Sequence, residues 1–328
     1  MHGKKVLVTG AGGFIGSHLV EALVEQGATV RAFIHYRSLP DLANLEHAQK
    51  EVLRKVEVIK GDITDPFSVK KALKDIDIVF HLAALIGIPY SYCAPQSYVN
   101  TNIIGTLNVL QAALDNRNTQ VIHTSTSETY GSALYSPIDE KHPLQGQSPY
   151  SASKIGADKI AESFYLSFAL PVTIIRPFNT YGPRQSARAI IPTIISQALT
   201  HPDKVKLGSL SPIRDFTYVS DTVSGFIQAS KSQTAIGKTI NLGTGKSCSI
   251  QELVDSVKKI LNLNFNVITD ESRVRPEKSE VIKLLSNPNL AKETFNWSAK
   301  TSLLDGLEQT IEFIKRNPNQ YKPQEYQV

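Results

Sequence analysis

A glycine-rich turn near the start of the chain constrains the fold more than any other feature. Residues 5–9 form a short apolar run, and residues 17–26 have a helical pattern that Gly27 ends. The turn between them contains Gly10, Gly12, Gly13, Phe14, Ile15 and Gly16. Because glycines let backbone N–H groups approach a pyrophosphate at a helix N-terminus, strand, turn and helix together predict a dinucleotide site. Alternatively, the glycines only allow strand and helix to pack closely.

Apolar strands alternate with helices beyond this turn, which predicts an α/β fold with a Rossmann-type, doubly wound parallel sheet. The strands are expected at 5–9, 29–34, 56–59, 76–81, 121–122 and 172–176, with 239–242 returning to the same sheet. Turn chemistry replaces this periodicity after Arg176, where we expect a smaller C-terminal α/β substrate lobe to begin.

The resulting domain prediction has three parts. Residues 1–177, with 215–244 returning to them, are expected to form the dinucleotide-binding domain. Residues 178–214 and 245–316 are expected to form the substrate lobe, and 317–328 a disordered tail rich in Pro, Gln and Tyr.

The residues after the second strand bear on the choice of dinucleotide. An acidic residue commonly stands there in NAD-binding units and binds the adenosine ribose. This chain instead has His35, Arg37 and Ser38, so NADP is favoured over NAD, unless Arg37 is simply solvated. The other residues expected to contact the cofactor are Asp62 and Ile63 at the adenine, the small-residue turn Leu82, Ala83 and Ala84, and Pro177.

Two polar clusters in the middle of the chain predict proton chemistry. Thr126, Ser127 and Glu128 follow a buried strand, and Tyr150 and Lys154 are spaced to share one helix face. A phenol titrates near ~10, and a nearby ammonium should lower that pKa. Thr126 can hydrogen-bond the same substrate oxygen as Tyr150, and Glu128 is a separate base. The constellation predicts proton removal from an alcohol, although a Tyr-x-x-x-Lys pair alone is often a solvated helix face.

Composition narrows the classes of partner. The net charge of +5 includes no marked basic run, which argues against nucleic acid and suits an anionic small molecule. No stretch approaches the ~20 apolar residues of a membrane span. Cys93 and Cys248 match no metal or redox spacing, so we expect a reducing compartment, the cytoplasm, and no metal site.

With these motifs assembled, the chain resembles the extended short-chain dehydrogenases/reductases that act on nucleotide sugars, over residues 4–313. The motifs that carry the resemblance are residues 9–16, 81–84, Tyr150 with Lys154, 176–183 and 214–216. It implies a Rossmann-type domain with a small lobe that binds a nucleoside diphosphate sugar. Residues 85–92, 125–128, 148–154 and 184–189 further resemble the bacterial UDP-N-acetylglucosamine dehydratases that open routes to legionaminic and pseudaminic acids.

This resemblance implies a mechanism and a set of site residues. Tyr150 takes the O4 proton while C4 loses hydride to a tightly bound, recycled NAD(P), and Lys154 holds the cofactor ribose. Glu128 removes the C5 proton and water leaves from C6. Hydride then returns to C6, giving a 4-keto-6-deoxy sugar, or to C4, leaving a 5,6-ene. The residues expected to bind the UDP-sugar are Ile86, Tyr90, Asn179, Arg188, Arg214 and Arg275.

Ser127 departs from the related dTDP-glucose 4,6-dehydratases, which carry an aspartate there that protonates the departing C6 hydroxyl. Serine is a far weaker acid, so the proton donor is left open among Glu128, a water and residues 85–93.

The alternatives are a UDP-glucuronate decarboxylase, a 4-epimerase, and a catalytically silent NADP-binding scaffold or sensor. The uncharged 85–93 loop argues against a uronic acid substrate, and a 4-epimerase would leave Glu128 idle. Helical segments 98–116 and 150–169 also match those that pair across a dimer interface in this superfamily, so a homodimer or larger homo-oligomer is expected.

Overall fold

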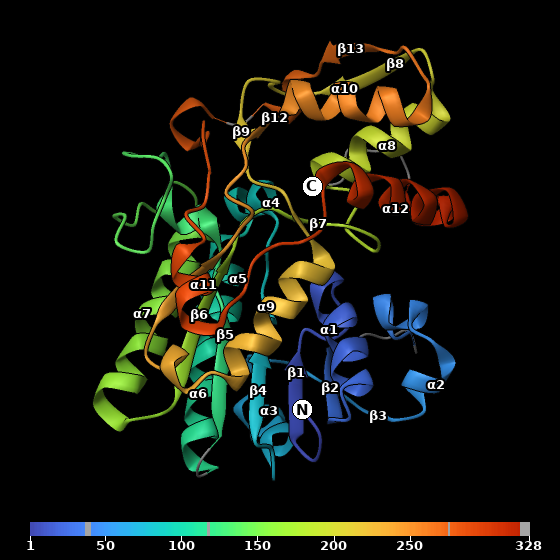
Figure 1. Cartoon of the computed structure of the whole chain (residues 1–328). Coiled ribbons are helices and arrows are strands. Elements are labelled where there is room, and N and C mark those ends of the chain that lie inside the picture. The colour runs from blue at the N-terminus through green and yellow to red at the C-terminus, as the bar shows by residue number, and fades with distance from the viewer. Residues whose placement is uncertain (37–40, 117–118, 275, 322–328) are drawn as a thin grey trace.

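The computed structural model describes residues 1–36, 41–116, 119–274 and 276–321 (Figure 1). Its main sheet has seven parallel strands in the order β11-β6-β5-β4-β1-β2-β3. They are β1 (Lys5–Thr9), β2 (Thr29–His35), β3 (Val56–Gly61), β4 (Ile78–His81), β5 (Gln120–Thr124), β6 (Val172–Pro177) and β11 (Thr239–Leu242). The predicted α/β class is confirmed, and the strand expected to return, β11, pairs with β6.

Helices cover both faces of this sheet because the strands are apolar on both sides. Val6 and Val8 of β1 point into one core with α1 and α9, whereas Leu7 points into the other with α3, α6 and α7. These helices are α1 (Phe14–Glu25), α9 (Val219–Lys231), α3 (Pro66–Leu73), α6 (Gly105–Asp115) and α7 (Pro149–Phe168). Both faces of the sheet are therefore covered, and ligands can reach it at the ends of its strands.

A second group of elements lies beyond the carboxyl ends of the main strands, at the top of Figure 1. It contains α8 (Ile190–Thr200), α10 (Ile250–Leu261), α12 (Leu303–Arg316), β8 (Lys204–Leu207), β13 (Asn266–Thr269), β9 (Ile213–Arg214) and β12 (Cys248–Ser249). The remaining elements are β7 (Thr180–Tyr181), β10 (Thr217–Tyr218), α2 (Lys50–Leu53), α4 (Ile88–Cys93), α5 (Pro95–Tyr98) and α11 (Asn289–Phe295). The division into two domains stays a prediction.

Three local predictions need correction. The expected loop at 85–93 contains a helix, α4, which Pro89 can begin because its first turn needs no N–H there. The expected helix 98–116 is interrupted by a π-helical stretch, Val99–Ile104. The expected disorder does not begin at residue 317, because Tyr321 is buried and its hydroxyl donates to Gln185 O at 3.2 Å.

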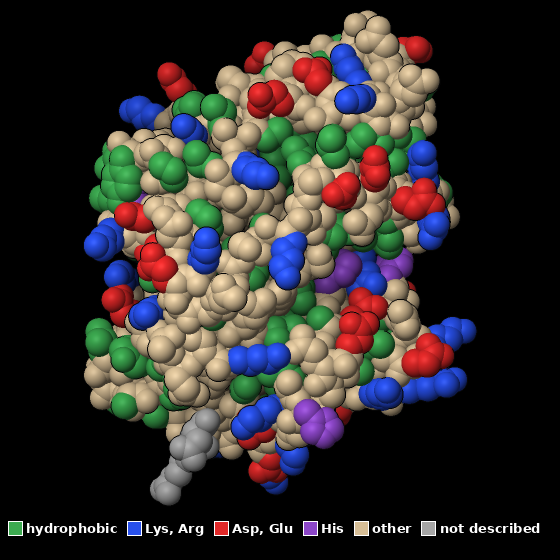
Figure 2. Space-filling model, viewed as in Figure 1, with side chains coloured by type: hydrophobic (Ala, Val, Ile, Leu, Met, Phe, Trp, Pro, Cys, Tyr) green, Lys and Arg blue, Asp and Glu red, His purple; other side chains and the backbone are tan. Residues whose placement is uncertain are grey.

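The surface shows no concentration of one charge on the face drawn in Figure 2, where lysine and arginine side chains are interspersed with acidic ones. Within the described residues, no helix combines the length and apolar character needed to cross a membrane.

The glycine turn after β1 is closed by backbone contacts. Gly10 has φ +69°, and a Cβ there would lie 2.8 Å from Ala83 N in the turn after β4. A Cβ on Gly16 would overlap the Gly10 carbonyl oxygen, whereas one on Gly13 would lie 3.0 Å from the same atom. Gly10 and Gly16 are thus required by the packing of β1, α1 and β4 on one another.

We predict that Gly16→Ala lowers the free energy of unfolding by about 2–3 kcal/mol, because backbone must move to admit the methyl group. Gly13→Ala is the matched control and should cost about 1 kcal/mol or less, since its neighbour needs to yield only slightly. Urea denaturation followed by circular dichroism measures both. Equal losses in the two variants would contradict this account of the turn.

Candidate active site

The candidate catalytic residues come together at the carboxyl end of β5. The strand ends at Thr124, and Ser127–Tyr130 follows as a 3₁₀ turn. Helix α7 begins beside it, where the Ser148 hydroxyl accepts the Ser151 N–H at 3.1 Å in a capping box. This cap fixes the first turn of α7, and Tyr150 and Lys154 are both buried there.

Tyr150 is held in a largely apolar setting. Its ring lies edge-on to Tyr98 with centroids 6.2 Å apart, and the Thr126 hydroxyl is hydrogen-bonded to its phenol. Burial raises the pKa of Tyr150 above its ordinary value, and the Glu128 charge acts in the same direction. The expectation that Lys154 lowers this pKa is not met, because burial of the phenol outweighs the opposing hydrogen bond.

Lys154 is directed to the end of β5. Its Nζ donates to Thr124 O at 2.6 Å, and only 4% of the residue is exposed. Burial lowers the pKa of Lys154 to about 8, and the Asp158 carboxylate opposes that change. The lysine therefore stays mostly charged at neutral pH and loses its proton as the pH rises through about 8.

Thr126 and Glu128 belong to the same cluster. Thr126 Oγ1 accepts the Glu128 N–H at 3.2 Å, which caps the 3₁₀ turn, and the Glu128 carboxylate acts electrostatically on Tyr150. Glu128 is half-buried, whereas Ser127 between them is buried. The structure thus brings together a hydroxyl, a carboxylate and a phenol, which is the arrangement needed for two separate proton transfers.

A buried hydrogen-bond chain positions the turn Leu82, Ala83 and Ala84. The Thr9 hydroxyl oxygen accepts the N–H groups of Leu82 and Ala83, both at 3.1 Å, and is 2.8 Å from His81 Nδ1. His81 Nε2 lies 3.0 Å from Thr106 Oγ1, which itself donates to a carbonyl. Thr9 therefore donates to Nδ1 and Nε2 carries the imidazole proton. Burial agrees with this neutral form, because it holds the pKa of His81 well below 6.5.

Asn102 is a site residue that the sequence analysis missed. It lies in the π-helical stretch, and its side chain bonds both Leu85 N (2.8 Å) and Leu85 O (3.0 Å). Its Nδ2 also donates to Ser153 Oγ at 2.9 Å, next to Lys154 on α7. Asn102 thus ties the 85–93 segment to the catalytic helix. The only signal in the sequence was an amide within an apolar helix.

The glycine turn fits a dinucleotide pyrophosphate. Helix α1, which Phe14 and Ile15 begin, has no side-chain cap and no acidic residue in its first turn. Its first N–H groups can therefore face an anion.

The other predicted cofactor residues lie at the neighbouring strand ends. His35 is exposed at the end of β2, and Asp62 after β3 accepts the Thr64 N–H at 2.8 Å. Ile63 is buried against Gly105, and Pro177 ends β6. Arg37 and Ser38 lie outside the described residues.

The predicted substrate residues lie in several elements beyond the strand ends. Ile86 and Tyr90 are exposed, and Arg188 approaches the same segment, with Nη1 3.3 Å from where a Gly87 Cβ would stand. Arg214 is buried, donates to Ile213 O at 3.0 Å and lies 3.5 Å from Glu280.

Asn179 and Arg275 complete this set. Asn179 Oδ1 is buried without a hydrogen-bond partner among the described residues, so this amide has capacity for a ligand. Arg275 lies outside the described residues. Among the residues that the structure describes, no group of three or more His, Cys, Asp or Glu side chains is placed to hold a metal ion.

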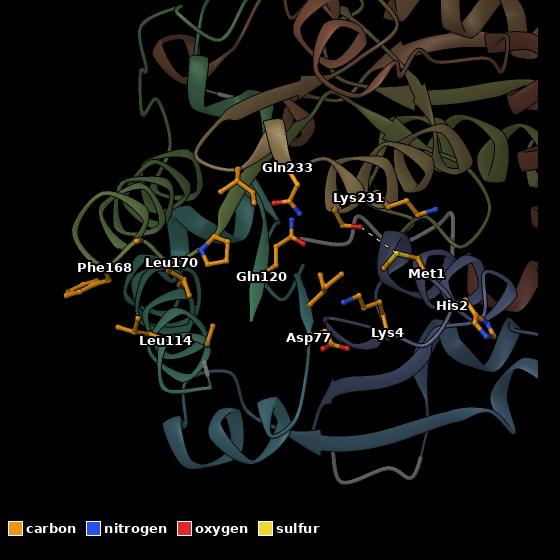
Figure 3. A pocket seen from close by; sticks show the side chains of 16 residues that line it. Met1, His2, Lys4, Asp77, Leu114, Gln120, Phe168, Leu170, Lys231 and Gln233 are labelled. Carbon is orange, nitrogen blue, oxygen red and sulfur yellow. Dashed lines mark hydrogen bonds between the residues drawn. The ribbon is translucent and has the colours of Figure 1, made fainter. Parts of the chain in front are cut away.

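A hollow of about 1020 Å³ lies at the opposite end of the strands, where they begin (Figure 3). Lys4, Asp77 and Gln120, at the amino ends of β1, β4 and β5, line it together with Lys231 and Gln233. None of the candidate site residues lines this hollow, so it does not belong to the site at the carboxyl ends of the strands.

A family model described as GDP-mannose 4,6 dehydratase matches residues 7–310, nearly the whole chain. The chain belongs to this family. It is thereby one of the extended short-chain dehydrogenases/reductases that comprise nucleotide-sugar dehydratases, epimerases and decarboxylases, as the sequence motifs had indicated.

Members with three different activities are similar to this chain over almost its full length. A UDP-N-acetyl-alpha-D-glucosaminuronate decarboxylase from Bacillus cytotoxicus is 32% identical over 96% of this chain and 99% of its own. The structure of the dTDP-glucose 4,6-dehydratase DesIV from Streptomyces venezuelae, solved as a double mutant with NAD and DAU, has a TM-score of 0.88 and 26% identity, covering 98% and 99%. UDP-glucuronic acid 4-epimerase from Bacillus cereus, solved with UDP-glucuronic acid and NAD, has a TM-score of 0.86 and 30% identity, covering 95% and 99%.

We predict that Asn102→Ala destabilises this family member by about 3 kcal/mol, because it leaves the Leu85 backbone and Ser153 without their buried partner. Asn100→Ala is the matched control on the same π-helical stretch. Asn100 is exposed, and its side chain accepts a hydrogen bond from the exposed Gln96, so its loss should change stability by no more than about 0.5 kcal/mol. Thermal unfolding compares the two, and an equally mild effect at Asn102 would contradict its role as a tie.

Proposed function

We propose that this protein is an NAD(P)-dependent dehydratase of UDP-N-acetylglucosamine that oxidises C4, removes the C5 proton and eliminates water from C6. The observation that carries the proposal is the Glu128 carboxylate on the same turn as Thr126, close enough for its charge to act on Tyr150. A 4-epimerase needs only the phenol, whereas a dehydratase also needs a base for C5. Glu128 supplies that second group.

Each residue has a distinct task in this mechanism. Tyr150 accepts the O4 proton, and Thr126 hydrogen-bonds the phenol so that its oxygen faces the sugar. Lys154, mostly charged at neutral pH, would hold the cofactor ribose. When bound, the nicotinamide supplies the hydride acceptor. The C4 ketone then acidifies C5–H for removal by Glu128.

The proton for the departing C6 hydroxyl comes from Glu128 itself, from a water or from a residue of the 85–93 segment, since Ser127 is too weak an acid. Hydride return to C6 gives a 4-keto-6-deoxy sugar, and return to C4 gives a 5,6-ene. Either product would serve nonulosonic-acid or related glycan biosynthesis, such as legionaminic or pseudaminic acid.

Further predictions accompany this function. The neighbours DesIV and UDP-glucuronic acid 4-epimerase are solved with NAD, which supports a nicotinamide dinucleotide here. The preference for NADP depends on Arg37 and stays a prediction, as do tight binding and recycling of the cofactor. A homodimer and a cytoplasmic location also stay predictions.

The test is incubation of the whole chain with UDP-N-acetylglucosamine, followed by mass spectrometry. We expect a product lighter by one water, which neither an epimerase nor a non-catalytic sensor would give. Glu128→Gln should slow its formation by about 10²–10⁴-fold, because it removes the C5 base. The variant should still retain its dinucleotide.

Glu162→Gln is the matched control for Glu128→Gln. Glu162 is an exposed carboxylate of α7 that pairs with Lys159 at 2.6 Å, so its loss should leave the rate unchanged. Normal turnover by Glu128→Gln would overturn the assignment of Glu128 as the base and, with it, the dehydratase proposal.

A uronic acid substrate is the second candidate, and one structural observation favours it. The 85–93 segment carries no cation of its own, yet Arg188 approaches it at Gly87 and acts electrostatically on Tyr98 beside Tyr150. The uncharged loop therefore does not exclude a cation there, because a distant segment supplies one. A guanidinium there could pair with a C6 carboxylate.

UDP-glucuronate distinguishes the two candidates. On the dehydratase proposal, we expect the chain to leave UDP-glucuronate unchanged while it dehydrates UDP-N-acetylglucosamine. Loss of carbon dioxide or epimerisation, weakened at least tenfold in Arg188→Gln, would instead establish the second candidate. Mass spectrometry detects decarboxylation, and proton NMR detects epimerisation.

A further inference from the structure

A buried carboxylate beneath the candidate active site has no task in the mechanism above. Asp158 lies one helical turn beyond Lys154 on α7 and is 2% exposed. Its Oδ1 is 3.2 Å from His123 Nε2, and its Oδ2 accepts from Ser125 Oγ at 2.7 Å. A buried carboxylate is costly unless paired, so an arrangement this complete requires a reason.

Arg176 provides the opposite charge. Its Nη2 and Nε donate to Asp158 Oδ2 at 2.8 and 3.2 Å, and its Nη1 donates to the Tyr130 hydroxyl at 3.0 Å. Burial alone would raise the pKa of Asp158, but the His123 hydrogen bond, the Arg176 charge and the Ser125 hydrogen bond together lower it to about 2. The carboxylate therefore stays ionised at any pH at which the enzyme would work.

The position of the two partners at the carboxyl end of β5 is the informative feature. His123 and Ser125, which the two Asp158 oxygens contact, are the residues on either side of Thr124. Thr124 O is the acceptor for Lys154 Nζ. Asp158 thus contacts the residues immediately before and after Thr124, whose carbonyl group accepts the hydrogen bond from the catalytic lysine.

We propose that Asp158 is a positioning residue for Lys154: it fixes the Thr124 carbonyl that receives the ammonium group and places a fixed negative charge one turn beneath it. This inference deepens the proposed function and rests on it for the part that Lys154 plays in catalysis. The arrangement of Asp158, Thr124 and Lys154 is independent of which nucleotide sugar reacts.

The surrounding charges are consistent with this role. The buried groups on which the Lys154 charge acts are His81 of β4 and His123 of β5, and burial lowers the pKa of both, so neither carries charge at neutral pH. Tyr150 on the same helix is neutral as well, because its pKa is raised. Arg176 of β6 reaches the cluster through Asp158. Asp158 is the charge that favours the ammonium form of Lys154.

The test is direct titration of Lys154 by NMR in the full-length protein with isotopically labelled lysine, the signal being assigned with Lys154→Arg. In the native chain we expect a midpoint of about 8. Asp158→Asn should move it about one pH unit lower, because the nearby negative charge is lost. The alkaline limb of kcat/KM for dehydration should move by the same amount, and Asp158→Glu should restore most of both.

Asp158→Asn leaves Arg176 buried without its carboxylate, so Asp158→Asn/Arg176→Gln is the second variant and should show the same downward shift with no unpaired charge. Asp221→Asn is the matched control, since it removes a buried carboxylate of α9 that bonds Thr301 N and should not move the Lys154 midpoint. An unchanged midpoint in either folded Asp158 variant would overturn the inference. Because the titration needs no substrate, a shifted midpoint with no dehydration would contradict only the proposed function.

Discussion

The hydrogen bond from Lys154 to the Thr124 carbonyl is the interaction on which the site depends. It joins α7 to the end of β5 and places an ammonium group where water is excluded. Burying that charge is unfavourable, and this burial lowers the pKa of Lys154. The protein offsets it with an ionised carboxylate beneath, which Arg176 and β5 in turn hold in place.

The same burial acts on the phenol in the opposite direction. Burial raises the pKa of Tyr150 above its ordinary value and lowers the pKa of Lys154. In the protein alone the proton therefore stays on the phenol. The neutral phenol is a hydrogen-bond donor that can orient a sugar hydroxyl or ketone. Proton removal from an alcohol then depends on lowering the pKa of this phenol, and the Thr126 hydrogen bond acts in that direction.

Much of the fold followed from local patterns. The strand, glycine turn and helix at 5–26 predicted the start of the sheet, and the apolar run at 239–242 predicted its last strand, because both depend on periodicity within a few residues. The spacing of Tyr150 and Lys154 likewise predicted that they share a helix face. Helix α4 and the packed Tyr321 were missed because burial by distant segments decides both.

What the sequence by itself determined was the parallel sheet, the glycine turn and the identities of the phenol, lysine, threonine and carboxylate in one site. Only the tertiary structure decided their environment. That environment includes the hydrogen bonds of Asn102 with Leu85 and Ser153, the approach of Arg188 to Gly87, and the contacts of Asp158 with the residues on either side of Thr124. The physical reason is that pKa values and hydrogen bonds depend on which groups meet across strands and helices. Residues 17 to 101 positions apart make those contacts, and no local pattern specifies them.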